Sequence, residues 1–74
     1  MTSLDAYLPY DGPLIELRLL PQQVIAVCRG LGAKGAPLGC QIWGNGGCLI
    51  VVPKHDDGTI RNHELAHCNG WKHS

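Results

Sequence analysis

Two short apolar segments flank a Gly-Asn-Gly-Gly tetrad in the second half of the chain, and this arrangement predicts a β-hairpin. The Asn45-Gly46 pair supplies the positive φ angles that a two-residue hairpin turn requires. With this pair at the centre of the turn, Trp43 lies opposite Cys48, and Cys40 lies opposite Val51. Because side chains alternate between the two faces of a strand, Cys40 and Cys48 then project from opposite faces of the hairpin.

The predicted register restricts how the four cysteines, Cys28, Cys40, Cys48 and Cys68, can pair. A Cys40–Cys48 disulfide is disfavoured because the two side chains point away from each other. We therefore expect the disulfides Cys28–Cys40 and Cys48–Cys68, with Cys28–Cys68 as the alternative that the sequence leaves open. Free cysteines buried as small apolar residues are a further alternative.

The small size of the chain makes such cross-links important for its stability. A chain of this size buries only about 60% of its unfolded surface, and small domains usually add disulfides, a metal ion or a partner chain. Of the 74 residues, 45% are apolar and 16% are charged, which is typical of a globular protein. We expect one domain over residues 1–74, with residues 1–13 as an N-terminal arm.

The cysteines also bear on the cellular compartment. Met1–Tyr10 contains an acidic residue and no basic residue, so no signal peptide is visible. If the cysteines are oxidised, an extracytoplasmic location, periplasmic or secreted, is favoured, because disulfides persist in oxidising compartments.

The rest of the chain predicts one further strand and two helices. Leu14–Leu20 alternates in part between apolar and polar residues, which indicates a strand. Pro21–Leu31 has a proline at its first position and helical apolar spacing, which indicates a short amphipathic helix. Thr59 is the expected N-cap of a second helix over Ile60–Asn69, which Gly70 ends. We expect an α+β fold with a sheet of about three strands and both helices on one face.

The distribution of charge excludes some classes of partner. Six basic and six acidic residues give a formal net charge of zero, and the basic residues are scattered along the chain. A nucleic-acid-binding surface needs clustered positive charge, so we do not expect nucleic acid as a partner. The longest apolar runs, Val24–Cys28 and Cys48–Val52, are far shorter than the roughly 20 residues of a membrane-spanning helix. We therefore expect no transmembrane span.

The second predicted helix contains the segment His-Glu-Leu-Ala-His, which begins at His63. His63 and His67 are four positions apart, so they share one helix face and their imidazoles can hold one zinc ion. Glu64 lies at the edge of the same face, where it can take a proton from a water that the metal activates. His63, His67 and Glu64 are therefore the candidate metal-binding and catalytic residues of this helix.

The pattern continues beyond the helix with a glycine and a third histidine. Gly70 follows His67 by three positions, and His73 follows Gly70 by three. A glycine in the left-handed conformation can turn the chain out of the helix, so that His73 returns to the metal. Three protein ligands and one water are the usual arrangement at a catalytic zinc.

The string from position 63 to position 73 resembles the extended motif of the metzincin metallopeptidases, H-E-x-x-H-x-x-G-x-x-H. The resemblance implies that His63, His67 and His73 are ligands of Zn²⁺ and that Glu64 is the general base. It implies a zinc-dependent metallopeptidase that hydrolyses peptide bonds in a peptide or protein substrate.

The resemblance also implies a fold. It is that of a minimal zincin-like α+β domain, with a small sheet that contains a β-hairpin, two helices, and the active-site helix at the C-terminus. In zincins an edge strand helps to bind an extended substrate, and the candidate here is the Cys48–Val52 strand or its hairpin partner. Metzincins have a methionine-containing turn after the third histidine. Met1 is the only methionine of this chain, so we expect a domain without that turn.

Two other functions remain open at this point. In the first, the zinc ion is structural and closes the C-terminus onto a disulfide-stapled interaction module. In the second, the chain is a disulfide-stapled interaction domain that binds no metal. Chelation should unfold the first kind of protein and leave the stability of the second unchanged.

Overall fold

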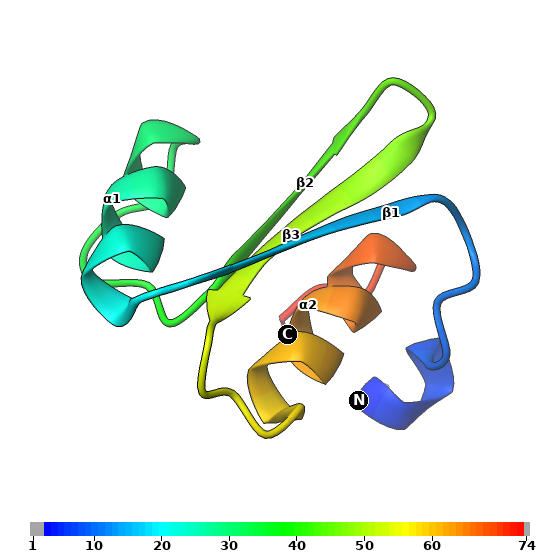
Figure 1. The fold of residues 1–74 in the computed structure, drawn as a ribbon. Helices are drawn as coiled ribbons and strands as arrows, with labels where there is room; N and C mark the ends of the chain where they lie inside the picture. Colours follow the sequence, from blue (N-terminus) through cyan, green and yellow to red (C-terminus); the bar gives the residue numbers. More distant parts are fainter. Residues whose placement is uncertain (1–2, 74) are drawn as a thin grey trace.

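A three-stranded sheet lies between two helices in the computed structural model, which describes residues 3–73 (Figure 1). In chain order the elements are a 3₁₀ helix, Leu4–Tyr7; β1, Leu14–Leu19; α1, Pro21–Gly30; β2, Cys40–Gly44; β3, Gly47–Pro53; and α2, Thr59–Cys68. The strand order is β1-β3-β2, with β1 parallel and β2 antiparallel to the central β3. This architecture confirms the α+β fold class, with a three-stranded sheet, a hairpin and the second helix at the C-terminal end.

The hairpin has the register that the turn residues predict. Trp43 pairs with Cys48, and Cys40 pairs with Val51. Asn45 adopts a φ of 51° in the turn, next to a glycine that also has a positive φ. The turn chemistry is therefore sufficient to set the register of β2 against β3.

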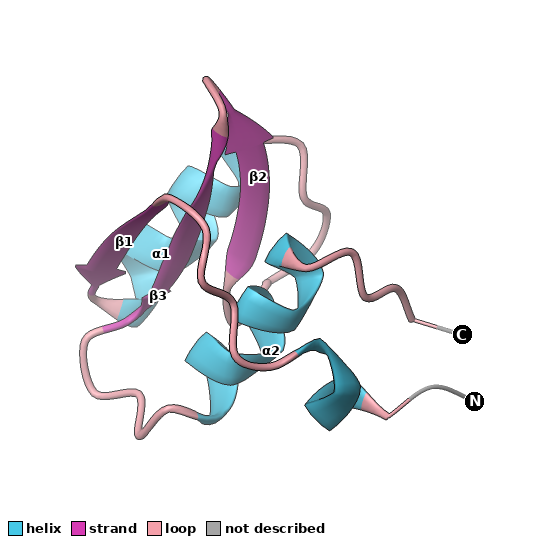
Figure 2. Ribbon diagram, turned by 90° about the vertical axis from the view of Figure 1, so that its right-hand side faces the viewer, coloured by secondary structure: helices cyan, strands magenta, loops and turns pink. Residues whose placement is uncertain are grey.

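Alternate residues of β3 belong to two apolar clusters, one on each face of the sheet. The buried members of the cluster against α2 are Cys48, Ile50, Val52, Leu65 and Cys68. Those of the cluster against α1 are Val24, Cys28 and Val51. The two helices therefore cover opposite faces, as Figure 2 shows. The prediction that both helices lie on one face was wrong.

The physical reason lies in the parallel pairing of β1 with β3. Two parallel neighbours need a connection that crosses over from one end of the sheet to the other, and α1 makes part of this crossing on one face. The other face then needs its own cover, which α2 supplies. The unbroken apolar run Cys48–Val52 is the usual pattern of a strand that is buried on both sides.

Each face carries one disulfide between a helix and the sheet. Cys28 of α1 is bonded to Cys40 at the start of β2, with 5.8 Å between their Cα atoms. Cys48 of β3 is bonded to Cys68, the last residue of α2, with 5.9 Å between their Cα atoms. The expected pairing is confirmed. Two disulfides are typical of proteins from oxidising compartments and so are consistent with an extracytoplasmic location.

The N-terminal segment, expected to be an arm, packs against the end of α2. The side-chain amide of Asn69 donates hydrogen bonds to the backbone carbonyls of Tyr7 and Pro9. Leu8 and Tyr10 pack against the cluster between β3 and α2. Within residues 3–73, no helix is long and apolar enough to cross a membrane.

The start of α2 differs from the expectation that Thr59 is its N-cap. Gly58 occupies the cap position with a φ of 111°, and Thr59 is the first helical residue. The Asp56 carboxylate accepts hydrogen bonds of 3.0–3.1 Å from the backbone N–H groups of Gly58, Ile60 and Arg61. Those N–H groups have no partner within the helix, and a carboxylate near the positive end of the helix dipole satisfies several at once.

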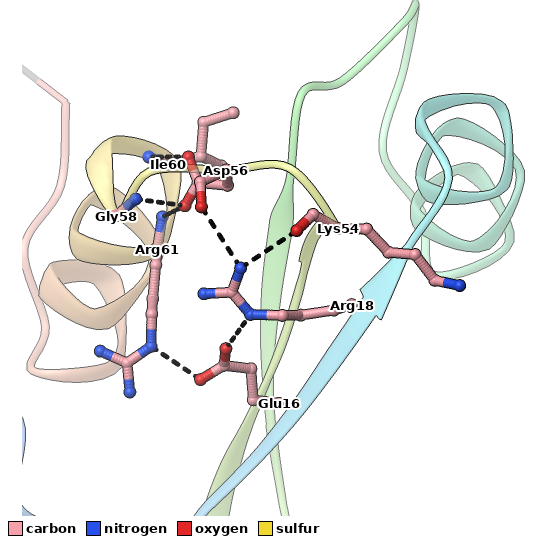
Figure 3. A network of polar contacts seen from close by, with 7 residues as sticks. All are labelled: Glu16, Arg18, Lys54, Asp56, Gly58, Ile60 and Arg61. Carbon is pink, nitrogen blue, oxygen red and sulfur yellow. Dashed lines mark hydrogen bonds and ion pairs between the residues drawn. The ribbon is translucent and has the colours of Figure 1, made fainter.

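A network of charged groups ties β1 to this helix start (Figure 3). The Glu16 carboxylate accepts hydrogen bonds of 2.7 Å from Nε of Arg18 and from Nε of Arg61. One Nη of Arg18 also donates to the backbone carbonyls of Lys54 and Asp56. The loop before α2 is thereby held against the sheet, and this fixes the direction in which α2 begins.

The Asp56 cap predicts a pH-dependent contribution to stability. Partial burial raises the pKa of the Asp56 carboxyl, but hydrogen bonds from the N–H groups of Ile60, Arg61 and Gly58 outweigh it and lower this pKa below its usual range. The carboxylate therefore stabilises the fold above its unfolded pKa of about 3.9, and the contribution is lost as the pH falls through the lower folded pKa.

We expect Asp56→Ala to lower the free energy of unfolding by about 1 kcal/mol at neutral pH, as for other cap losses. The difference from the unchanged protein should shrink as the pH falls below about 4. Denaturant unfolding with the disulfides intact, measured over a pH series, tests this. Asp11→Ala, a change in the exposed loop before β1, is the control. An equal loss in both variants would contradict the capping role.

Candidate metal centre

Three histidines converge at the C-terminal end of α2. His63 and His67 lie one turn apart on the helix, and Gly70 adopts a φ of 95° just beyond it. The N–H groups of Gly70 and Trp71 donate back to carbonyls of the last helical turn, so the chain reverses direction. His73 is thereby brought next to the other two histidines.

The ligand atoms of these side chains are close enough for one ion. Nε2 of His67 lies 3.1 Å from Nε2 of His63 and 3.1 Å from Nε2 of His73. One ligand atom from each residue lies within 4.8 Å of the others. In a tetrahedral zinc site with Zn–N bonds of 2.0–2.1 Å, ligand nitrogens are about 3.3 Å apart. Within residues 3–73, this is the one such group of three or more potential ligands.

The ring of His67 is held in the orientation that metal binding requires. Its Nδ1 lies 2.8 Å from the backbone carbonyl of Trp71. A carbonyl only accepts, so Nδ1 carries the hydrogen and the lone pair of Nε2 faces the other histidines. Outer hydrogen bonds of this kind fix the tautomer and the ring position of a histidine ligand.

Trp71 forms an aromatic base under the cluster. Its ring centroid lies 5.1 Å from that of His63, 4.9 Å from that of His67 and 4.6 Å from that of His73. The sequence suggests that Trp71 is a hydrophobic plug under the end of the helix. The half-buried indole packs against all three imidazoles, which is compatible with that role.

The electrostatics of the cluster favour the neutral form of His63. Partial burial lowers the pKa of His63, and the neighbouring His67 and His73 lower it further through charge repulsion. A metal binds the unprotonated ring, so a lowered pKa makes the nitrogen of His63 more available at neutral pH. The donor set, three imidazoles, suits zinc and also other divalent transition metals.

Glu64 is buried beside the histidines, with 7% of its surface exposed. Burial raises the pKa of its carboxyl to about 7. A group of this pKa is well suited to exchange protons near neutral pH. The sequence places Glu64 at the edge of the histidine face, and the structure turns it toward the segment that leads into β2. A Cβ added to Gly39 would lie 3.4 Å from Oε2 of Glu64.

A pocket of about 370 Å³ opens next to His63 and Glu64. Its other lining residues are Pro37, Leu38, Gly39, Thr59 and Ile60. From the sequence, residues 32–39 are rich in glycine, alanine and proline and predict only a loop, without a place beside the site. No local pattern marks them, because the contact with α2 joins segments more than 20 residues apart in the sequence.

The sequence predicts that the Cys48–Val52 strand or its hairpin partner is an edge strand that could bind a substrate, and the first of these two candidates is wrong. β3 lies between β1 and β2 and is hydrogen-bonded on both sides, so it cannot be an edge strand. Its hairpin partner β2, the other candidate, lies at an edge of the sheet. β2 follows directly on the residue that approaches Glu64.

The chain matches no protein-family model, no curated protein sequence and no solved structure. The resemblance to metzincins therefore stays a prediction that rests on the sequence motif from 63 to 73.

The cluster predicts that the protein binds one zinc ion per chain at neutral pH. His73→Ala should weaken this binding by at least about 100-fold, because loss of a ligand exceeds the 10- to 100-fold effect of losing an outer partner. Elemental analysis and competition with a chromophoric chelator measure both values. His55→Ala, which removes an exposed histidine outside the cluster, should bind zinc normally. Equal weakening in both variants would argue against the three-histidine site.

The contact of Trp71 with the three imidazoles predicts an optical signal. A paramagnetic ion such as Co²⁺ in the cluster should quench the fluorescence of this indole, whose centroid lies within 5.1 Å of each ring. Trp71→Phe should remove most of the quenching and leave only the emission of Trp43. Unchanged quenching in Trp71→Phe would place the ion elsewhere.

Proposed function

We propose that this protein is a zinc-dependent peptidase in which His63, His67 and His73 hold the metal and Glu64 is the general base. The observation that carries the proposal is the convergence of three Nε2 atoms at one helix end, together with the buried Glu64, which lines one pocket with His63. A structural metal site needs no such acid next to it, whereas hydrolysis needs a group that moves protons.

The chain's own residues account for the proton transfers. When bound, zinc supplies a water of lowered pKa and polarises the carbonyl of the scissile bond. Glu64 accepts a proton from the attacking water and later donates it to the nitrogen of the leaving amine. Its raised pKa of about 7 suits both steps, because a carboxylate and a carboxylic acid are then close in free energy.

The free edge of β2 supports a peptide as the substrate. An extended chain can add to an exposed sheet edge through main-chain hydrogen bonds. β2 is such an edge, and the segment before it lies against Ile60 and Glu64. A peptide paired along β2 would pass the acid and the three histidines.

Glu64→Gln provides the test. The change keeps the size of the side chain and removes the base, so we expect zinc binding to persist and peptide cleavage to fall by about 10²- to 10⁴-fold. Incubation of the zinc-loaded protein with a peptide mixture, read by mass spectrometry, measures the cleavage. Asp11→Asn is the matched control, because it removes a carboxylate far from the cluster in sequence. Cleavage at an unchanged rate in Glu64→Gln would refute the mechanism.

The alternative is a non-catalytic zinc module stapled by disulfides. The burial of Glu64 favours it, because only 7% of the residue is open to solvent. In that case zinc would pin the residues after Gly70 onto α2. Chelation would then loosen the C-terminal segment, and no peptide of the mixture would be cleaved by any variant.

A further inference from the structure

β1 lies at one edge of the sheet, and within residues 3–73 no strand pairs with its outer side (Figure 2). We propose that this edge pairs with β1 of a second copy of the chain, in antiparallel orientation, so that the protein is a symmetric dimer with one continuous sheet. The inference does not depend on the proposed function, because it concerns the edge opposite to β2 and involves no metal.

The pairing with β3 determines which backbone groups of β1 face outward. The backbone carbonyls of Pro13 and Leu19 accept hydrogen bonds from β3 and from the residue that follows it. Because alternate residues of a parallel strand bond to the same neighbour, the odd-numbered residues of β1 face β3. The backbone groups of Leu14, Glu16 and Arg18 therefore face away from the sheet. Outward N–H and carbonyl groups of this kind are a template for a further strand.

The charges on β1 select one register for such a pair. Two antiparallel registers join the outward-facing residues and overlap all but one residue of β1. One of them places Glu16 opposite Glu16 of the second copy, and like charges in this position are destabilising. The other places Glu16 of each copy opposite Arg18 of the other. This second register therefore contains two cross-strand pairs of opposite charge, and the edge is complementary to itself.

The same register matches apolar side chains on the face that α1 covers in part. Leu17 then lies opposite Leu17 of the second copy, and Ile15 lies opposite Leu19. The helix packs mainly against Val51 of the central strand and leaves Ile15 and Leu17 64% and 39% exposed. Proline or lysine within an edge strand often blocks such pairing, and β1 contains neither. A second copy would cover the apolar side chains that α1 leaves open.

The two charged side chains are accessible to a second copy. Glu16 and Arg18 keep 23% and 38% of their side-chain surface exposed, although they pair with each other. Directly opposite residues of a hydrogen-bonded antiparallel pair have Cα atoms about 5.5 Å apart, which is within reach of a guanidinium and a carboxylate. The network in Figure 3, in which Glu16 also accepts from Arg61, would thus continue across the interface.

Self-pairing of β1 also gives a closed assembly. Pairing of β1 with β2 of another copy would leave one free edge at each end and would continue into a filament, whereas a twofold pair of β1 strands closes. The twofold axis is perpendicular to the sheet, so each face of the sheet remains continuous. Both α2 helices, with the candidate metal centres, then lie on the same face, and both β2 edges stay free.

Sedimentation equilibrium of the disulfide-bonded protein tests the dimer. A small interface is typical of a weak complex, so we expect a monomer–dimer equilibrium at micromolar concentrations. Glu16→Lys and Arg18→Glu each place like charges opposite each other at two positions, and each should weaken the dimer by about 10-fold. Asp11→Lys, which makes the same change of charge in the exposed loop before β1, should dimerise normally.

An equimolar mixture of the two variants provides the decisive comparison. In the mixed dimer, the lysine at position 16 of one chain faces the glutamate at position 18 of the other, and Arg18 faces Glu16. Both cross-strand pairs again have opposite charges, so the mixture should dimerise about as tightly as the unchanged protein. Circular dichroism checks that each variant is folded, and a folding defect would not be repaired by mixing.

Leu17→Cys tests the register without a change of charge. In the proposed pair the two introduced cysteines lie opposite each other, with Cα atoms about 4.5 Å apart, which a disulfide can span. Mild oxidation should therefore give a covalent dimer, and peptide mapping should find the native disulfides intact. Ile15→Cys is the control, because position 15 is more exposed but its two copies would lie about 13 Å apart along the strands.

The results separate self-pairing from the alternatives. Cross-linking of Leu17→Cys but not of Ile15→Cys, together with recovery in the mixture, would support the proposal. A chain that stays monomeric up to about 1 mM, or faster cross-linking of Ile15→Cys, would overturn it. A monomer would leave the edge open to an extended peptide of another protein. None of these measurements uses the metal site, so the proposed function stands or fails separately.

Discussion

Burial of β3 on both faces is the constraint on which the rest of the structure depends. Ile50, Val51 and Val52 are each fully buried, and together they contact both helices. A chain of 74 residues has few other residues with which to build a core. Each helix is then bonded to the sheet by one disulfide, so the two faces are closed independently. The position of α2, and with it that of the candidate metal centre, follows from this arrangement.

Local signals in the sequence predict much of the fold and most of the candidate site. The turn residues set the hairpin register, and the register in turn restricts the cysteine pairing. The spacing of His63 and His67, together with the glycine before His73, is enough to predict that the three side chains meet. All these features depend on residues close together in the chain, for which backbone preferences and side-chain periodicity are reliable guides.

Features that depend on distant segments could not be predicted in this way. The placement of the helices on opposite faces follows from the parallel pairing of β1 with β3, which no local pattern specifies. Asp56 displaces Thr59 as the capping group because the loop folds back over the helix start, where Arg18 and Glu16 hold it. The pocket beside Glu64 depends on the close approach of Gly39, from a segment that the sequence marks only as a loop.

The Cys48–Cys68 disulfide also determines which atoms compete for a metal ion. Cys68 directly follows His67, and in the reduced chain its thiolate would be a softer ligand for zinc than an imidazole. The disulfide with Cys48 removes this sulfur as a possible metal ligand. The three histidine nitrogens are then the donor atoms that lie close together. With this disulfide closed, the end of α2 presents imidazole nitrogens and no thiolate.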